Sequence, residues 1–143
     1  MGVEIERKFL VADESWRESA TSATAIMQGY LAAAPRATVR VRVRGEEAFL
    51  TIKGATPGIS RSEYEYEIPS SDAEQILADF CGGHVISKTR YHREFGGHLW
   101  EIDVFEGDNA GLVIAEVELA SEAEPLSLPD WVTEEVTDDA RYY

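Results

Sequence analysis

The sequence predicts an α+β fold in which eight antiparallel strands close into a β-barrel with a few flanking helices. Three observations lead to this fold class. Apolar and polar residues alternate with period two along most of the 143 residues, which is typical of β-strands that bury one face. Segments with helical spacing are few and short. The charged faces are also segregated, basic on some strands and acidic on others, and this favours a closed arrangement in which they meet.

The first predicted strand, residues 3–11, carries Glu4, Glu6 and Lys8 on one face. Residues two apart in a strand point to the same side, so two carboxylates and an ammonium lie in a row. The opposite face is apolar, with Arg7 as its one interruption. Paired carboxylates suit a hard divalent cation, and the lysine beside them suits an anion. This strand therefore predicts phosphate chemistry.

The next segments are a short helix over residues 13–20, a less cleanly patterned strand over 25–31, and two basic strands. The segment 38–44 places Thr38 and three arginines opposite three valines. After a hairpin turn, residues 49–53 place Thr51 and Lys53 on one face. These two strands predict one continuous basic surface.

Residues 61–68 form an acidic strand with three glutamates backed by two tyrosines and an isoleucine. A helix over 71–80 follows, because Ser71 and Glu74 match a capping box and apolar residues recur at helical spacing after them. Residues 86–93 then return to a basic pattern. The sign of the charged face thus changes from one strand to another.

Two further acidic strands complete the predicted barrel. Residues 99–105 place Glu101 and Asp103 on one face, and residues 114–119 repeat the paired carboxylates of the first strand. A third helix is expected near 131–137, after two prolines. With no internal repeat or linker, residues 1–143 are predicted to form a single domain.

The direction of the charged faces decides what kind of barrel this is. Taken singly, each charged row is typical of a solvated strand face. Taken together, rows of like charge are a poor solubility surface, which normally mixes the two signs, and the valines and aromatic residues opposite them need cover. We therefore predict that the charged faces point inward. Buried charges are costly unless they are paired, so the lumen should be a wet tunnel for a polyanionic, metal-chelating ligand such as a phosphate chain.

Composition narrows the range of partners. A formal net charge of −14 argues against nucleic acid or an anionic membrane as the main partner. The single cysteine, Cys81, excludes an intramolecular disulfide and a zinc-type cluster. The sequence shows no signal-type or membrane-spanning apolar run, so a cytoplasmic location is the default expectation. Monomer and homodimer both remain open.

The residue blocks resemble the CYTH superfamily of triphosphate tunnel metalloenzymes. Residues 3–11 match its E-x-E-x-K signature, and further blocks follow in the family's order over nearly the whole chain, namely 28–31, 39–42, 50–54, 61–67, 88–91, 100–107, 115–119 and 131–143. The resemblance implies an eight-stranded β-tunnel that binds a triphosphate in its lumen and hydrolyses it with Mg²⁺ or Mn²⁺.

The resemblance also implies roles for particular residues. The metal ligands would be carboxylates, with Asp103 assisting the other four: Glu4, Glu6, Glu116, Glu118 and Asp103. The phosphate oxygens would be held by Lys8, Arg40, Arg42, Lys53, Lys88 and Arg90. Lys8 and Arg40 are also expected in catalysis, together with Glu63 and Glu65, which match acidic tunnel positions that bind metal, orient a basic neighbour or place water.

The expected activity is hydrolysis of a small-molecule triphosphate, foremost inorganic tripolyphosphate. The chain is short and offers no long insertion for a base or thiazole pocket. Thiamine or nucleoside triphosphatase activity and adenylate cyclase activity remain alternatives. A non-catalytic polyphosphate-binding module is a further alternative, although such a module could dispense with the metal-type carboxylates that are all present here.

Overall fold

The computed structural model describes residues 2–34, 36–54, 59–82 and 84–142; Tyr143, the last residue of the family-like tail, lies outside them. Within the described residues, nine strands form one antiparallel sheet: β1 (Gly2–Val11), β2 (Ser22–Ala33), β3 (Ala37–Arg44), β4 (Glu47–Gly54), β5 (Ser60–Ile68), β6 (Ile86–Phe95), β7 (His98–Phe105), β8 (Val113–Glu118) and β9 (Val132–Glu135).

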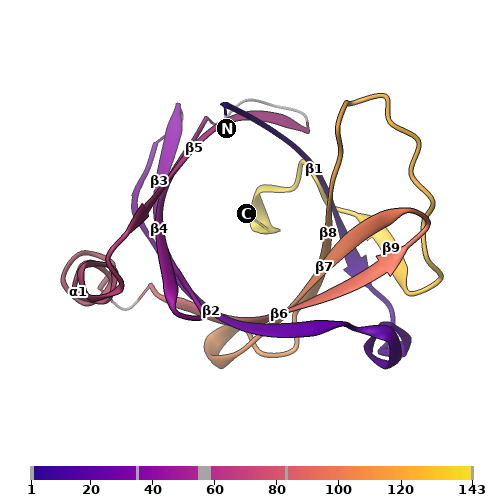
Figure 1. Ribbon diagram of the computed structural model, residues 1–143, viewed down its shortest axis with the longest axis horizontal. Helices are drawn as coiled ribbons and strands as arrows, with labels where there is room; N and C mark the ends of the chain where they lie inside the picture. The colour runs from indigo at the N-terminus through magenta and orange to yellow at the C-terminus, as the bar shows by residue number, and fades with distance from the viewer. Residues whose placement is uncertain (1, 35, 55–58, 83, 143) are drawn as a thin grey trace.

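Eight of these strands close into a barrel. The order β5-β4-β3-β2-β6-β7-β8-β1 is completed by pairing of β1 with β5, in the register Gly2 with Glu63 through Ile5 with Ser60. Figure 1 shows the result as a ring. The predicted eight-stranded antiparallel barrel is therefore confirmed.

The first strand is shared between two partners along one edge. Its first half pairs with β5, and its second half pairs with β9, where Phe9 lies opposite Glu135 and Val11 opposite Val132. The predicted helix over 131–137 is therefore wrong. Beyond Ile5, β1 no longer pairs with β5, so unpaired backbone groups on that edge of β1 are available to the carboxyl-terminal segment. The β-branched Val132 and Thr133 also suit a strand better than a helix.

The helical segments are short. They are α1 (Ser70–Phe80) and the 3₁₀ turns η1 (Ser15–Ser19), η2 (Gly107–Asn109) and η3 (Ala140–Tyr142). The helix α1 begins one residue earlier than predicted, after Pro69, and no side chain caps it. The predicted capping box is therefore wrong: Ser71 lies inside the first turn, while the Ser70 hydroxyl donates to the Glu46 carbonyl oxygen at 2.8 Å.

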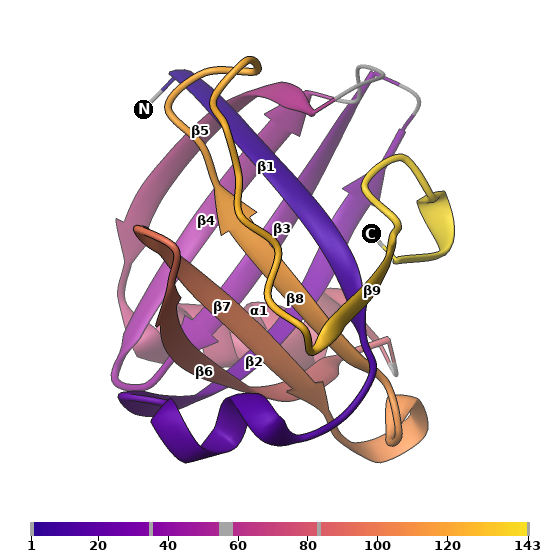
Figure 2. The same ribbon diagram turned by 90° about the vertical axis from the view of Figure 1, so that its right-hand side faces the viewer.

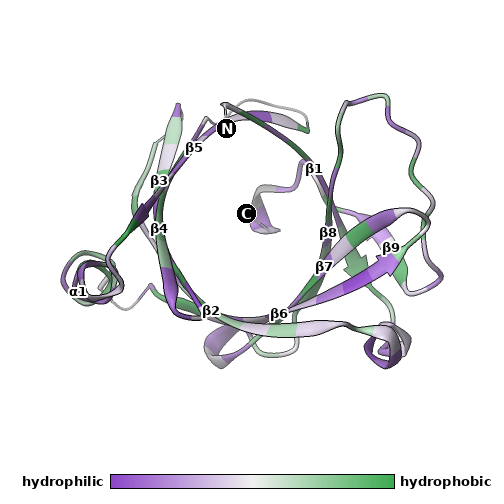
Figure 3. Cartoon of the chain, in the orientation of Figure 1, coloured by the Kyte–Doolittle hydropathy of each residue, from purple (hydrophilic) through white to green (hydrophobic). Residues whose placement is uncertain are grey.

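The hydrophobic core lies outside the ring, not within it. One cluster, between the strand faces of β1, β7 and β8 and the segments around Trp16 and Trp131, includes Phe9, Trp100 and Ile102. A second cluster packs α1 against β3 and β4, and Figure 1 shows α1 on the outside of the ring. Figure 3 shows hydrophilic and hydrophobic residues following one another along the strands. The apolar faces point outward to these covers, so the polar faces are left to line the lumen.

None of the described helices has the length and apolar character needed to cross a membrane.

Replacing Gly29 by alanine is expected to destabilise the fold by about 1–3 kcal/mol. A Cβ at this position would lie 2.8 Å from both Cβ and Sγ of Cys81 and 3.1 Å from a methyl carbon of Leu77, so α1 would be pushed off β2. The midpoint of urea denaturation measures the loss. Gly54→Ala is the matched control, because its Cβ would meet its nearest neighbour, in Ser62, at an ordinary 3.6 Å; equal losses in both variants would contradict this account of packing.

Candidate functional site

The barrel encloses a cavity of about 610 Å³ whose wall is mostly charged. Alternate residues of the strands point into it, as period two requires. The lining includes every residue for which the sequence predicted a role, with the exception of Asp103, namely Glu4, Glu6, Lys8, Arg40, Arg42, Lys53, Glu63, Glu65, Lys88, Arg90, Glu116 and Glu118. Strands far apart in the sequence thus bring these side chains around one lumen.

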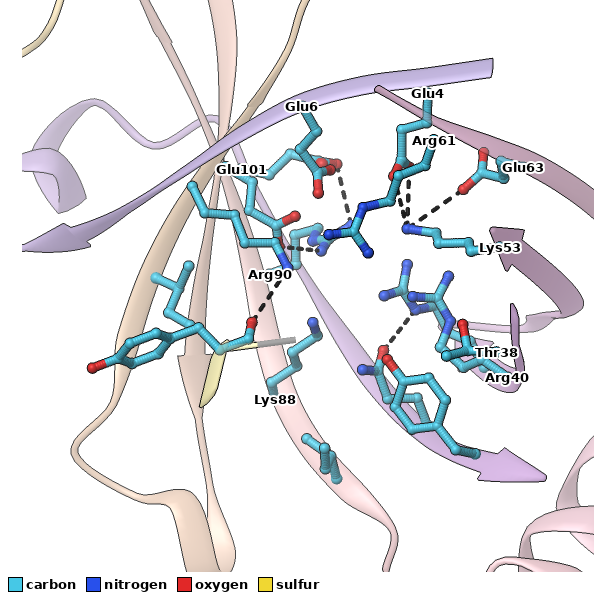
Figure 4. A pocket seen from close by; sticks show the side chains of 18 of the residues that line it. Glu4, Glu6, Thr38, Arg40, Lys53, Arg61, Glu63, Lys88, Arg90 and Glu101 are labelled. Carbon is cyan, nitrogen blue, oxygen red and sulfur yellow. Dashed lines mark hydrogen bonds and ion pairs between the residues drawn. The ribbon is translucent and has the colours of Figure 1, made fainter. Parts of the chain in front are cut away.

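Lys53 of β4 lies between two carboxylates. Its ammonium donates to both oxygens of Glu4, at 2.9 and 3.2 Å, and lies 3.6 Å from Glu63. Figure 4 shows the lysine reaching across to β1 and β5. Burial opposes ionisation of Glu4, yet the charge of Lys53 lowers its pKa. Burial and the neighbouring Glu4 raise the pKa of Glu63 to about 7.

Glu6 and Glu116 form a second acidic pair, on neighbouring strands β1 and β8. Burial, together with the charges of Glu116 and Glu4, holds the pKa of Glu6 well above its usual value. Burial opposes ionisation of Glu116 too, but the cations around it, Lys8 first and then Arg90, hold its pKa well below the usual value. The pKa values of the two carboxyl groups are thus shifted in opposite directions, because cations dominate the surroundings of Glu116 and other carboxylates those of Glu6.

Asp103 faces the same side as these carboxylates but is fully buried behind two basic residues. Its oxygens accept from Arg90 at 2.7 and 2.8 Å and pair with Lys88 at 2.7 Å. Burial lowers the pKa of Lys88 to about 8 although Asp103 opposes the shift. Both carboxylate oxygens are engaged, so the geometry suits Asp103 to holding Lys88 and Arg90 in position within the wall.

The arginines of β3 supply the basic side of the lumen. Arg40 and Arg42 are 7% and 8% exposed. The Arg42 Nε donates to the Gln28 side-chain oxygen at 2.8 Å, and burial, with the charge of Arg40, lowers the Arg42 pKa to about 10. Arg40 lies opposite Thr51 in the register of β3 with β4. Within the described residues the Nε of Arg40 meets no hydrogen-bond acceptor. This is a surface ready to receive oxygens of an anion.

The sequence assigned no role to several polar or charged residues of the lining. Arg61, Glu101 and Gln28 all line the cavity, and Glu101 lies 3.4 Å from both Arg90 and His92. The alternation of 61–68 and 99–105 places Arg61 and Glu101 on the inward faces, so parity alone could have found them. Gln28 lies on the weakly patterned strand β2 and gave no such signal.

The carboxyl-terminal segment closes one end of the lumen. The backbone N–H of Val136 donates to the Lys8 carbonyl oxygen at 2.8 Å, and the Lys8 ammonium donates to the carbonyl oxygen of Tyr142 at 3.2 Å. Thr137, Arg141 and Tyr142 are part of the cavity wall. Figure 1 shows this segment at the centre of the ring, and Figure 2 shows it at one end of the barrel. Residues of this segment thus line the lumen, although Glu134, Glu135 and Asp138 are exposed.

A hard divalent cation requires oxygen ligands, and the carboxylates of the lumen supply them. In residues 2–34, 36–54, 59–82 and 84–142, no three His, Cys, Asp or Glu side chains form a ready-made metal cluster. Mg²⁺ does not need one, because it is commonly bound by one or two carboxylates together with waters and substrate phosphates. The carboxylate oxygens of Glu6 and Glu116, which line the lumen from neighbouring strands, fit such a cation.

Adding Mg²⁺ is expected to raise the melting temperature of the metal-free protein by several degrees. A cation bound among Glu4, Glu6 and Glu116 offsets their mutual repulsion, and binding to the native state alone adds about 2.7 kcal/mol at a hundred times the dissociation constant. Differential scanning fluorimetry with Mg²⁺, against NaCl at the same ionic strength, measures the shift. An equal rise with NaCl would reduce the effect to general screening.

Comparison with known proteins gives the following similarities. The model of the CYTH domain family matches residues 2–143. An inorganic triphosphatase from Acetivibrio thermocellus is 47% identical over 142 residues, which are 99% of this chain and 90% of that protein. An inorganic triphosphatase from Nitrosomonas europaea is 41% identical over 144 residues, covering 97% and 92%. The crystal structure of the inorganic triphosphatase NE1496 superposes with a TM-score of 0.68 at 37% identity, covering 100% of this chain and 92% of that one.

Proposed function

This chain belongs to the CYTH domain family, and we propose that it is a metal-dependent triphosphatase that releases phosphate from inorganic tripolyphosphate inside its barrel. One observation carries the proposal. A single lumen holds buried arginines and lysines on one part of its wall and the half-buried carboxylates Glu4, Glu6 and Glu116 on another. The activity printed for two relatives that are 41–47% identical over nearly the whole chain supports the same reaction.

The basic residues hold the substrate. Arginine binds phosphate oxygens through paired N–H groups, and such charge-assisted bonds are stronger than neutral ones. Five side chains are buried or half-buried in the wall where they meet a polyanion from several strands, namely Lys8, Arg40, Arg42, Lys88 and Arg90. Asp103 positions the last two through its 2.7 Å contacts. The site thus fixes the phosphate chain and stabilises the charge that develops on its oxygens during transfer.

The acidic residues hold Mg²⁺ or Mn²⁺. Glu4, Glu6, Glu116 and Glu118 line the lumen with oxygen donors, and Asp103 stands behind the basic wall. When bound, the cation polarises phosphate oxygens and offsets their charge. Without it, the carboxylates would repel the substrate, so binding and turnover both depend on how these four side chains are neutralised.

Glu63 and Glu65 have different surroundings on β5. Glu63 lies 3.6 Å from the ammonium of Lys53, so it serves to orient a basic neighbour. Glu65 accepts a hydrogen bond from the Thr51 hydroxyl at 3.0 Å, which fixes its carboxylate at the wall beside the arginines of β3. Water attacks the terminal phosphorus in line with the departing pyrophosphate, and these carboxylates hold that water at the wall.

A panel of substrates tests the proposal. Phosphate release is measured with tripolyphosphate, ATP, thiamine triphosphate and pyrophosphate, each with Mg²⁺, Mn²⁺ or EDTA, and cyclic AMP is assayed in the ATP reactions. The expected result is the highest kcat/KM on tripolyphosphate and none in EDTA. A higher kcat/KM on thiamine triphosphate or ATP, production of cyclic AMP, or turnover in EDTA would each contradict it.

A further inference from the structure

A neutral amide, and not a carboxylate, holds Arg42 in the wall of the lumen. Gln28 of β2 is 6% exposed and lies directly opposite Arg42 of β3. Its side-chain oxygen accepts from the Arg42 Nε at 2.8 Å, and both side chains line the cavity. Within the part of the chain that the structure describes, no carboxylate forms an ion pair with Arg42. The guanidinium is thus fixed by a partner that carries no charge.

The basic residues of the neighbouring strand β6 are held differently. Arg90 and Lys88 both contact Asp103, at 2.7 to 2.8 Å, so a buried carboxylate offsets part of their charge. Arg42 has no such partner. Burial, together with the charges of Arg40 and Arg90, lowers the pKa of Arg42 to about 10. Its positive charge is therefore unfavourable in this wall, although the guanidinium stays protonated at neutral pH, and an anion that reaches it relieves the unfavourable charge.

The chemistry of residue 28 decides how much of the Arg42 charge remains for a ligand. A carboxylate of the same size would pair with Arg42 and cancel its charge before any substrate arrives. An apolar residue would leave the buried Nε–H of Arg42 without its acceptor, which is costly. Glutamine avoids both outcomes, because its oxygen fixes the planar guanidinium and adds no charge.

We propose that Gln28 is a positioning residue that orients Arg42 toward the phosphate chain and leaves the positive charge of Arg42 uncancelled. This inference rests on the proposed triphosphatase function, in which Arg42 binds phosphate oxygens. Because the Nε–H of Arg42 donates to Gln28, the terminal N–H groups of the guanidinium are left for the substrate, and arginine commonly binds phosphate through two parallel bonds. Gln28 thus acts on the reaction through Arg42.

Gln28→Glu tests whether the neutrality of the amide matters. Its carboxylate is expected to pair with Arg42, to raise KM for tripolyphosphate and to lower kcat/KM by about ten- to a hundredfold, the usual worth of one charge-assisted contact. The melting temperature in EDTA should rise, because the new pair offsets a buried charge. Despite burial, the cations around Glu116 hold its pKa well below the usual value, so a carboxylate among the cations of this lumen should ionise. Gln75→Glu, on the exposed face of α1, is the matched control and should leave kcat/KM unchanged.

Variants in a second background separate positioning from packing. Gln28→Leu keeps a similar volume and removes the acceptor, so it should lower both kcat/KM, by about tenfold, and the melting temperature. If Gln28 acts through Arg42, its effect on the reaction must disappear when Arg42 is removed. In the Arg42→Ala background, Gln28→Leu and Gln28→Glu are therefore expected to change kcat/KM by no more than about twofold. Circular dichroism establishes that each variant is folded; if Gln28→Leu is not, Gln28→Glu with and without Arg42→Ala decides.

The outcomes separate this inference from the proposed function. Absence of tripolyphosphate turnover in the unaltered chain would overturn the proposed function, and with it the role of Gln28 in the reaction. Turnover in the unaltered chain with an unchanged kcat/KM in Gln28→Glu would overturn the role of Gln28 alone. The same holds if Gln28→Glu lowers the melting temperature, or if its effect on kcat/KM is equally large with and without Arg42.

Discussion

Glu116→Gln is expected to lower kcat for tripolyphosphate by about a hundred- to a thousandfold, the cost of removing one element of transition-state charge stabilisation. Glu116 is the carboxylate that the cations around it, Lys8 first, keep ionised despite burial, and it lies beside Glu6. Glutamine keeps the volume and removes the charge on which cation binding depends. Phosphate release with Mg²⁺ measures kcat.

The loss should be in turnover more than in substrate binding. Calorimetry with tripolyphosphate is expected to show binding to the Glu116→Gln variant, because the basic wall remains. Glu74→Gln is the matched control, since Glu74 lies on the exposed face of α1, and its kcat should equal that of the unaltered protein. Unchanged hydrolysis in the Glu116 variant would mean that this carboxylate does not hold the metal.

Arg40→Ala should lower kcat/KM for tripolyphosphate by about ten- to a hundredfold, because one charge-assisted contact is worth about 1.5–3 kcal/mol. Arg40 is 7% exposed and lines the lumen, and within the described residues its Nε meets no acceptor. Its guanidinium is therefore placed for a ligand. Steady-state phosphate release over a range of tripolyphosphate concentrations gives the effect on KM and kcat separately.

Two companion variants sharpen the Arg40 measurement. Arg40→Lys keeps the charge and loses the planar fork, so it should restore part of the activity. Arg36→Ala removes a charge from an exposed residue before the same strand and should leave kcat/KM unchanged. Kinetics of Arg40→Ala indistinguishable from those of Arg36→Ala would place Arg40 outside the phosphate site.

The barrel and most of its lumen could be predicted because strand periodicity is a strictly local signal. Once the first strand is known to alternate, Glu4, Glu6 and Lys8 must share a face, and the same parity places Arg40 with Arg42 and Glu116 with Glu118. The inward direction followed from charge segregation, and the cavity confirms it.

How deeply each charged side chain lies within the barrel wall could not be predicted, because this depends on the pairing between strands. Glu101 and Asp103 have the same parity, yet Asp103 lies opposite Arg90 and is taken up by ion pairs, whereas Glu101 lines the lumen. The tail was missed for a similar reason. Residues Val132–Glu135 form β9, and not the expected helix, because they pair with the free edge of β1. No local pattern in residues 131–137 reveals that edge.

The rate of phosphate release from tripolyphosphate by the unaltered protein, in Mg²⁺ and in excess EDTA, tests most directly whether this protein is a metal-dependent triphosphatase. Turnover is expected to be rapid with Mg²⁺, to be abolished by EDTA and to be restored by added Mg²⁺. Equal rates in both conditions, or no turnover in either, would contradict a metal-dependent triphosphatase in this barrel.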